Sequence, residues 1–251
     1  MKHLDLFSGL GGFSLACQWA GIETIGFVEI DKYCQKILRK HWPNVPIVED
    51  IRDVKEDTFQ RPVDLITGGF PCQDISYARS WTTQGAYITA GIDGKRSGLW
   101  GEMCRIVEAY QPEFVVAENV PALTAKGLDV VLRDLAEVGY DAEWSVMPAA
   151  LFGAPHLRQR IWIVAYPHSI GWDEESLILS HVFSQEIRHA PQWQPSRAVC
   201  QAHGKKALPE TLGIYDGLSR GLHDAERLQC LGNAVVPQVA YEIIKVIVEQ
   251  Q

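Results

Sequence analysis

Residues 3–13 read HLDLFSGLGGF, and this stretch decides the fold. A short apolar run leads directly into glycines at positions 9, 11 and 12, and the residues that follow are typical of a helix. Glycine allows a tight turn and a close approach of the backbone to a ligand, and the free N–H groups at a helix start favour bound anions. The stretch therefore predicts a buried strand, a glycine-rich turn and a helix, with a ligand at the turn.

The same alternation of apolar runs and helix-like stretches continues along the chain. Strands are expected at residues 3–7, 24–30, 63–67, 114–119, 142–148 and 161–166. Helices are expected near residues 12–20, 31–41, 99–110 and 127–138, with a closing helix within 235–251. Short buried strands separated by helices predict an α/β fold with a doubly wound, mostly parallel sheet.

The periodic pattern stops near Pro167. From 167 to 227 the chain is irregular and rich in His, Ser, Pro and Trp, which predicts a small separate lobe. We expect residues 1–166 and 228–251 to form one catalytic and ligand-binding domain. Residues 73–96 are another long stretch with few apolar runs, a pattern that favours a lid or binding loop.

Composition limits the classes of partner. The formal net charge of −8 argues against a protein that coats nucleic acid nonspecifically, because phosphate binding draws on a surplus of Lys and Arg. The charge is unevenly distributed, however, since residues 151–228 hold eight basic and eight acidic side chains. The later segment is therefore the less repulsive face for a polyanion, although a solvated surface of mixed charge has the same composition.

The six cysteines form no C-x-x-C pair and no metal-ligand spacing, so we expect neither a disulfide framework nor a metal site. The longest apolar run is far short of a membrane span, and the opening residues lack the features of a secretion signal. We therefore expect a cytoplasmic protein with no membrane partner.

The glycine turn has the form G-x-G-x-x-S and follows Phe7, which fits S-adenosylmethionine better than NAD. Glu29 ends the second expected strand, where a carboxylate accepts hydrogen bonds from ribose hydroxyls. Asp50 comes near the end of a further short strand expected within 47–51 and is a candidate for the adenine amino group. A glycine-rich turn without a ligand is the alternative, and Asp31 is expected to be a helix N-cap.

A second set of reactive side chains follows other strands. Cys72, in VDLITGGFPCQDIS (63–76), comes just past a buried strand, at the sheet edge where open α/β folds bind ligands. Glu118 ends the strand 114–119, and Arg158 and Arg160 precede the strand 161–166. Each has a plainer interpretation: a small core residue for the cysteine, a structural carboxylate, and surface ion pairs for the arginines.

Together these groups suit methyl transfer to a pyrimidine. Addition of a thiolate to C6 of cytosine makes C5 nucleophilic enough to take a methyl group from a sulfonium. A carboxylic acid at N3 relieves the developing negative charge, and an arginine near the exocyclic oxygen adds electrostatic stabilisation. Cysteine is also a good leaving group, so the covalent intermediate is reversible.

Five ordered motifs resemble those of the DNA cytosine-5 methyltransferases, in particular short prokaryotic or phage-like members. They are FSGLGGF (7–13), GGFPCQDIS (68–76), ENV (118–120), RQR (158–160) and GNAVVPQVA (232–240). The resemblance implies a Rossmann-like class I methyltransferase fold with a target-recognition lobe. It also implies methylation of cytosine C5 in double-stranded DNA, with S-adenosylmethionine as cofactor, through a Cys72 adduct on a flipped-out base.

The resemblance also assigns residues to the two sites. Its catalytic residues are Cys72, Glu118, Arg158 and Arg160. Its cofactor-binding residues are Phe7, Gly9, Gly11, Glu29, Ile30, Asp50, Ile51, Pro71 and Asn233. The expected protein is a monomer in a prokaryotic cell or phage-infected host, with a paired restriction endonuclease as a further partner.

Two other functions remain open at this point. The related tRNA-modifying branch uses the same motifs, and discrimination by the 2′-hydroxyl leaves no mark in this sequence. A noncatalytic relative that only binds DNA or a partner protein is the other alternative. The lobe of 61 residues from 167 to 227 is shorter than the usual target-recognition domain of the family.

Overall fold

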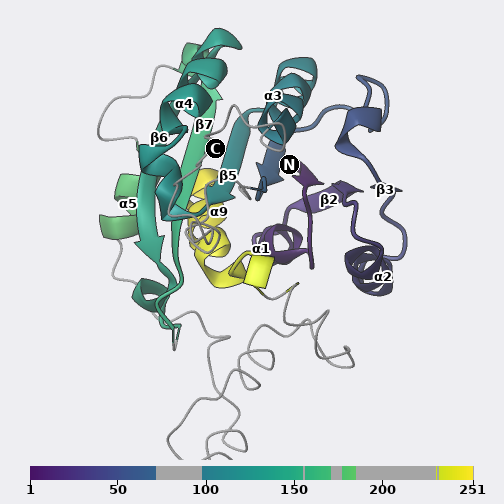
Figure 1. Cartoon of the computed structure of the whole chain (residues 1–251), viewed down its shortest axis with the longest axis horizontal. Helices are drawn as coiled ribbons and strands as arrows, with labels where there is room; N and C mark the ends of the chain where they lie inside the picture. The colour runs from purple at the N-terminus through teal and green to yellow at the C-terminus, as the bar shows by residue number, and fades with distance from the viewer. Residues whose placement is uncertain (72–97, 155, 171–176, 185–229, 231, 251) are drawn as a thin grey trace, which may run out of the picture.

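The computed structural model describes residues 1–71, 98–154, 156–170, 177–184, 230 and 232–250. Within these ranges seven strands form one sheet with the order β3-β2-β1-β4-β5-β7-β6 (Figure 1). The strands are β1 (Lys2–Leu6), β2 (Glu23–Val28), β3 (Ile47–Val48), β4 (Leu65–Gly68), β5 (Phe114–Asn119), β6 (Tyr140–Pro148) and β7 (Gln159–Pro167). β7 is antiparallel to both of its neighbours, and the pairings among β3, β2, β1, β4 and β5 are all parallel.

Helices cover both faces of the sheet. The α-helices are α1 (Gly12–Trp19), α2 (Lys32–His41), α3 (Gly98–Tyr110), α4 (Leu128–Glu137), α5 (Ile178–Ser184) and α9 (Pro237–Glu249). Short 3-10 turns are η1 (Ile51–Asp53), η3 (Pro121–Ala125), η4 (Ala149–Phe152) and η5 (His168–Ile170). Among the helices that the structure describes, none combines the length and apolar character needed to cross a bilayer.

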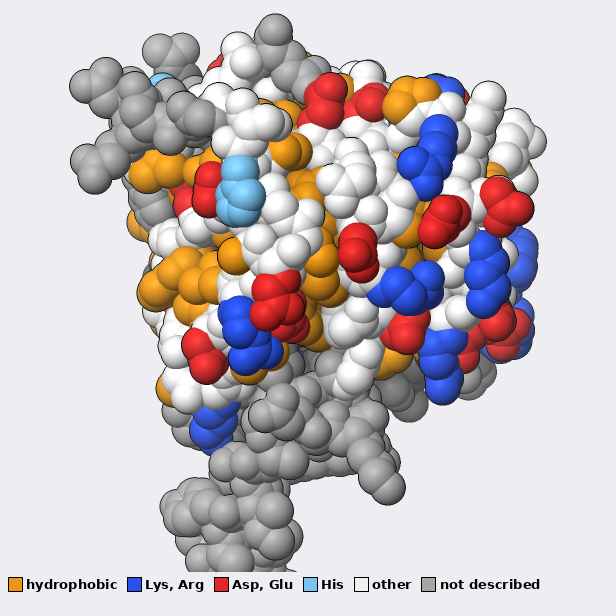
Figure 2. Space-filling model, turned by 90° about the horizontal axis from the view of Figure 1, so that it is seen from above, with side chains coloured by type: hydrophobic (Ala, Val, Ile, Leu, Met, Phe, Trp, Pro, Cys, Tyr) orange, Lys and Arg blue, Asp and Glu red, His pale blue; other side chains and the backbone are white. Residues whose placement is uncertain are grey.

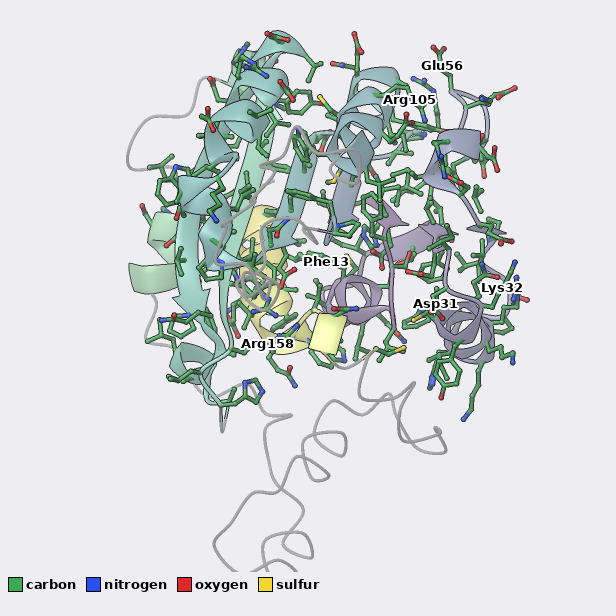
Figure 3. All side chains as sticks on the ribbon, viewed as in Figure 1. Phe13, Asp31, Lys32, Glu56, Arg105 and Arg158 are labelled. Carbon is green, nitrogen blue, oxygen red and sulfur yellow. The ribbon has the colours of Figure 1, made fainter. Side chains whose placement is uncertain are left out.

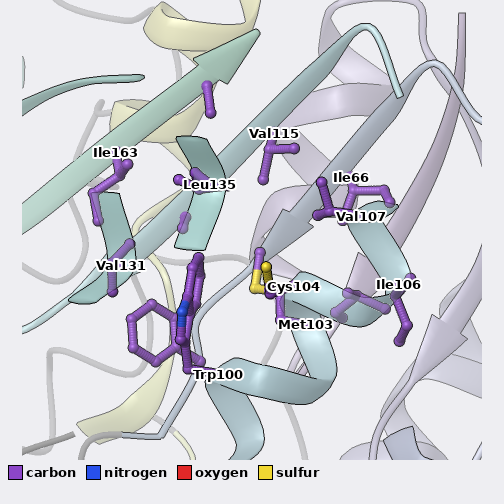
Figure 4. Close-up of a cluster of buried hydrophobic side chains, with 14 of the residues drawn as sticks. Ile66, Trp100, Met103, Cys104, Ile106, Val107, Val115, Val131, Leu135 and Ile163 are labelled. Atoms are coloured by element: carbon purple, nitrogen blue, oxygen red, sulfur yellow. The ribbon is translucent and has the colours of Figure 1, made fainter. Parts of the chain in front are cut away.

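One face of the sheet packs against α3 and α4. Trp100, Met103 and Val107 of α3 and Val131 and Leu135 of α4 are buried against the sheet (Figure 4). These positions recur every three or four residues, so each helix turns one apolar stripe toward the sheet. Burial of such side chains contributes on the order of 1.5 to 3 kcal/mol each.

The opposite face packs against α1, α5 and α9. The aromatic side chains of Phe13 and Trp162 meet edge to face, with ring centroids 5.9 Å apart. Val239 and Ile243 of α9 and Ile178 of α5 are buried in the same cluster. The C-terminal helix therefore lies against the first helix, a contact between the two ends of the chain that Figure 1 also shows.

The register of the central strands brings three loops together. Leu6 of β1 pairs with Gly68 of β4, and Gly68 pairs with Ala117 of β5. The strands are parallel, so the residues after Leu6, Gly68 and Ala117 emerge at the same carboxyl edge. The glycine turn, the segment that leads to Cys72, and Glu118 therefore begin side by side.

The expected fold is confirmed. Each expected strand and helix of the main domain is present, and the sheet is doubly wound and mostly parallel. α5 falls within the range predicted for the lobe and packs on the main sheet through Ile178 and Leu179. The rest of that lobe and the predicted lid at 73–96 lie almost wholly outside the described residues, so the lobe and its bounds stay a prediction.

Candidate active site

The glycine turn leaves the sheet in a left-handed backbone conformation. φ is +53° at Phe7, +52° at Gly9 and +81° at Gly11. A side chain is tolerated poorly in this region, so Phe7 is held there by its surroundings rather than by its own preference. Gly11 is the N-cap of α1 and has no side chain to cap the helix, whereas the Asp5 carboxylate accepts a backbone hydrogen bond from Ser14 in the first turn. The first N–H groups of α1 therefore face the turn, where the dipole of the helix favours a negative charge.

Glu29 holds the turn against the end of β2. One carboxylate oxygen, Oε2, accepts a hydrogen bond from the Gly9 N–H at 2.7 Å, and Oε1 accepts one from the Asp31 N–H at 2.7 Å. Burial raises the pKa of Glu29, and hydrogen bonds from the backbone N–H groups of Asp31, Gly9 and Ile30 oppose that rise. Each carboxylate oxygen has a further lone pair, so the group is still able to accept hydrogen bonds from a ligand.

Asp31 is a helix cap, as expected. Its side chain accepts hydrogen bonds from the backbone N–H groups of Tyr33 and Cys34, at 2.7 and 3.0 Å. These bonds satisfy two of the free donors at the start of α2. The acidic side chain therefore has a structural task next to Glu29.

The other residues predicted for an adenosyl group lie along the ends of β2 and β3. Ile30 directly follows Glu29 and is 64% exposed, which is unusual for a large apolar side chain. Ile51 is buried. Asp50 caps η1, and its carboxylate binds the Arg52 guanidinium through both oxygens, which lowers the pKa of Asp50.

These features fit S-adenosylmethionine. The start of α1, where the N-cap residue is a glycine, offers N–H donors for a carboxylate. Glu29 offers acceptors for ribose hydroxyls, and Ile30 offers an exposed apolar surface for a purine. In the described ranges, no group of three or more His, Cys, Asp or Glu side chains is placed to hold a metal ion.

Glu118 lies at the end of β5 and forms a buried ion pair with Arg160. Oε1 of Glu118 is 2.9 Å from Nε of Arg160, and the Glu118 side chain is 9% exposed. Burial raises the pKa of Glu118, while the positive charges of Arg160 and Arg158 and the hydrogen bond from Arg160 act to lower it. The raised pKa favours the protonated carboxyl, which is the form that donates a hydrogen bond.

Cys72 lies outside the described residues, but the segment that leads to it is described. A methyl group placed on Gly69 would come within 3.4 Å of the other Glu118 oxygen, Oε2. The next carbonyl, that of Phe70, accepts a hydrogen bond from Nδ2 of Asn119 at 3.1 Å. The chain therefore passes directly beside the acid before it reaches Pro71 and Cys72.

The two arginines of the RQR motif have different partners. Arg160 binds Glu118, whereas the guanidinium of Arg158 donates to the carbonyls of Gly232 and Ala234. The backbone of Arg158 is left-handed, with φ of +22°. Figure 3 shows Arg158 beside the C-terminal segment, drawn in yellow. Asn233, predicted to contact the cofactor, is exposed between these two carbonyls.

Sequence reasoning did not assign a role to Asn119 or Val235. Asn119 holds the Phe70 carbonyl, and Val235 packs against both Gly12 and Gly69. Asn119 lies in the ENV motif and Val235 lies in the GNAVVPQVA motif, so both belong to stretches that the sequence analysis had identified. Their contacts join parts of the chain that are far apart in the sequence, so the folded structure is needed to reveal them.

Comparison with known proteins agrees with this geometry. A family profile described as C-5 cytosine-specific DNA methylase matches residues 1–213. Type II methyltransferase M.CviJI of Paramecium bursaria Chlorella virus IL3A is 32% identical over 220 residues, which cover 87% of this chain and 55% of the relative. Type II methyltransferase M.NgoFVII of Neisseria gonorrhoeae is 33% identical over 226 residues, which cover 88% and 58%. The chain thus spans about half the length of the curated relatives it matches.

Solved structures support the same assignment of the fold. A putative DNA modification methyltransferase encoded within an Escherichia coli prophage has a TM-score of 0.56 at 27% identity, covering 69% of this chain and 48% of that one. The Dnmt2 methyltransferase of S. pombe has a TM-score of 0.71 at 16% identity, covering 100% and 99%, a likeness of fold alone. The fold is that of the class I methyltransferases, and with a family profile over most of its length, this chain belongs to the C-5 cytosine-specific DNA methylase family.

Proposed function

We propose that this protein methylates C5 of cytosine in double-stranded DNA, with Cys72 as nucleophile and S-adenosylmethionine as methyl donor. The observation that carries the proposal is the position of Glu118. This buried carboxyl is paired with Arg160 and lies beside Gly69, three residues before Cys72. Strand β1 lies next to β4, the strand that leads to Gly69, and β1 leads into the glycine turn. Methyl donor, nucleophile and acid would therefore meet at one edge of the sheet.

Glu29 and the start of α1 would hold the cofactor. When bound there, S-adenosylmethionine supplies an electrophilic methyl group on a sulfonium. The Gly9 and Asp31 N–H groups fix the Glu29 carboxylate, so its remaining lone pairs point to a defined place for ribose hydroxyls. The exposed side chain of Ile30 would cover one face of the adenine.

The reaction would proceed through a covalent bond between protein and base. The Cys72 thiolate adds to C6 of a cytosine flipped out of the duplex, and protonated Glu118 donates a hydrogen bond to N3 as negative charge develops. C5 then takes the methyl group as its bond to the sulfonium sulfur breaks, and S-adenosylhomocysteine is the leaving group. Loss of the C5 proton to a base and departure of the thiolate from C6 restore the aromatic ring and free Cys72.

Arg160 would complete the polar surroundings of the base. Its Nε is bound to Glu118, and its side chain is 20% exposed, so the guanidinium is oriented and still reachable. A fixed positive group beside the carboxyl stabilises charge on the exocyclic oxygen of the ring without reorganising during the reaction.

The proposal is tested by following labelled methyl groups from S-adenosylmethionine into nucleic acid. We expect the full chain to form 5-methylcytosine in duplex DNA, and Cys72→Ser to abolish product while cofactor affinity by calorimetry stays within about twofold. Methyl transfer into tRNA and not into DNA would overturn the assignment of DNA as the substrate. Undiminished methyl transfer by Cys72→Ser would overturn the assignment of Cys72 as the nucleophile.

A further inference from the structure

The segment 232–236 joins the two halves of the proposed site, and it is called the clasp segment below. It precedes α9, which is fixed to the core by buried residues such as Val239 and Ile243. The clasp segment itself is more exposed: Gly232 and Asn233 are on the surface, and Ala234 to Val236 are half-buried. Ala234, Val235 and Val236 pack against the edges of hydrophobic clusters, so specific contacts add to this partial packing in setting the position of the segment.

Arg158 supplies such contacts at the N-terminal part of the clasp segment. Nη1 and Nη2 lie 3.1 and 3.2 Å from the Gly232 carbonyl oxygen, and Nη2 also donates to the Ala234 carbonyl oxygen. The two carbonyls flank Asn233. One guanidinium therefore binds the carbonyl groups before and after Asn233, the residue predicted to contact the cofactor. These hydrogen bonds are charge-assisted and so are stronger than neutral ones.

Val235 supplies the contacts on the side of the glycine turn. A methyl group placed on Gly12, the first residue of α1, would lie 2.8 Å from the Val235 carbonyl oxygen and 3.1 Å from its Cβ. Such distances leave no room for a side chain, so the clasp segment touches the backbone at the start of α1. The position needs glycine because of this close approach.

The same valine reaches the loop that leads to Cys72. A methyl group on Gly69 would lie 3.7 Å from Cγ2 of Val235 and 3.4 Å from Oε2 of Glu118. Val235 and the acid thus approach the same short stretch of backbone. A shift of the clasp segment would therefore change contacts both at the start of α1 and beside Glu118.

We propose that Arg158 is a positioning residue that holds the clasp segment against Gly12 and Gly69, and so couples the cofactor site to the base site. This role rests on the proposed function for what the two sites bind. It differs from the role of Arg160, which touches the acid itself. The hydrogen bonds fit this division, because the guanidinium of Arg158 binds the clasp segment whereas that of Arg160 binds Glu118.

The test compares Arg158→Ala and Arg158→Lys with Arg160→Ala, and uses Arg133→Ala on the exposed side of α4 as the matched control. Cofactor affinity is measured by calorimetry without DNA, methyl transfer is measured separately, and amide hydrogen exchange follows residues 235–240. Arg158→Ala should weaken cofactor binding at least about tenfold, the loss expected for one or two charge-assisted hydrogen bonds. It should also speed exchange in 235–240.

The other variants separate positioning from direct contact with the base. Lysine cannot span two carbonyls as a planar fork does, so Arg158→Lys should recover only part of the affinity. Arg160→Ala should lower kcat and leave cofactor affinity unchanged, and Arg133→Ala should change neither. If Arg158→Ala folds poorly, Arg158→Lys carries the same test at smaller amplitude.

The inference is overturned if both Arg158 variants bind the cofactor as the wild type does and exchange at the wild-type rate in 235–240. Affinity and exchange are read without nucleic acid, so this outcome says nothing against the reaction. Failure of the wild-type chain to methylate DNA would instead overturn the proposed function, and hydrogen exchange would still report whether Arg158 holds the clasp segment.

Discussion

At the scale of single residues, the protonation state of Glu118 governs the proposed chemistry. Burial raises its pKa against the opposing effect of Arg160, so the protonated form persists to higher pH than in an exposed glutamate. Methyl transfer should therefore hold below the raised pKa and decline as pH rises through it. Glu118→Gln should lower kcat by roughly 10²- to 10⁴-fold, the usual contribution of a positioned proton donor, and remove this decline. A variant within a few-fold of wild-type kcat across the pH profile would exclude Glu118 as the donor.

Residue types and order could be predicted from the sequence more readily than side-chain direction. The cap at Asp31 and the position of Glu118 at the carboxyl edge of the sheet followed from their places at the start of a helix and the end of a strand. Arg158 and Arg160 are two residues apart and would share one face of an extended strand. The left-handed φ at Arg158, just before β7 begins, breaks that alternation, and nothing in the local sequence signals it.

At the scale of elements, a buried polar network links β2, β1, β4 and α1. His3 hydrogen-bonds Thr24 and Thr67 at 3.0 and 2.7 Å, and Asp5 accepts hydrogen bonds from Ser14 at 2.6 Å and from Thr67 at 3.3 Å. The apolar run HLDLF predicted β1 correctly. The partners of its two polar residues depend on how β2 and β4 align with β1, which periodicity alone does not fix.

This network makes a prediction about stability and pH. Burial raises the pKa of Asp5 to about 7 and lowers that of His3 to about 3. Above an ordinary pKa of 3.8 and below about 7, Asp5 keeps its proton only when folded, so its contribution falls as pH rises. Between about 3 and 6.5, His3 takes up a proton only on unfolding, so its contribution grows as pH rises. The two slopes, each up to about 1.4 kcal/mol per pH unit, should cancel between about pH 4 and 6.5.

Single variants should expose each slope. Relative to the wild type, Asp5→Asn should make the free energy of unfolding rise with pH between about 4.5 and 6.5, and His3→Gln should make it fall, each by the linkage of about one proton. Urea unfolding at three pH values in this range measures both. Wild-type slopes in the two variants would contradict the buried titrations.

At the scale of the whole molecule, net charge bears on how the proposed DNA substrate would be bound. The net charge is −8, and the face in Figure 2 shows acidic and basic side chains interspersed rather than a patch of one sign. We therefore expect random-sequence duplex DNA to bind more weakly than about 10⁻⁶ M at physiological salt. Fluorescence anisotropy with a labelled duplex measures this, and submicromolar binding would contradict it.

The fold could be predicted at this scale because strands and helices alternate with clear periodicity. The surface that would recognise DNA could not be predicted from the sequence. Residues 167–227 lack periodicity, and the chain spans about half the length of its curated relatives. Because residues 151–228 carry no net charge while the whole chain carries −8, we expect this segment to be the less repulsive face for DNA.

The central claim is that the sulfur of Cys72 forms a bond with C6 of a cytosine. It is tested most directly by incubating the chain with S-adenosylmethionine and a duplex containing 5-fluorocytosine, in which fluorine blocks the final elimination. We predict a stable protein–DNA adduct whose digestion and mass spectrometry place the methylated base on Cys72, and no adduct with Cys72→Ser. An adduct on another residue, or none while ordinary duplex is methylated under the same conditions, would contradict the account.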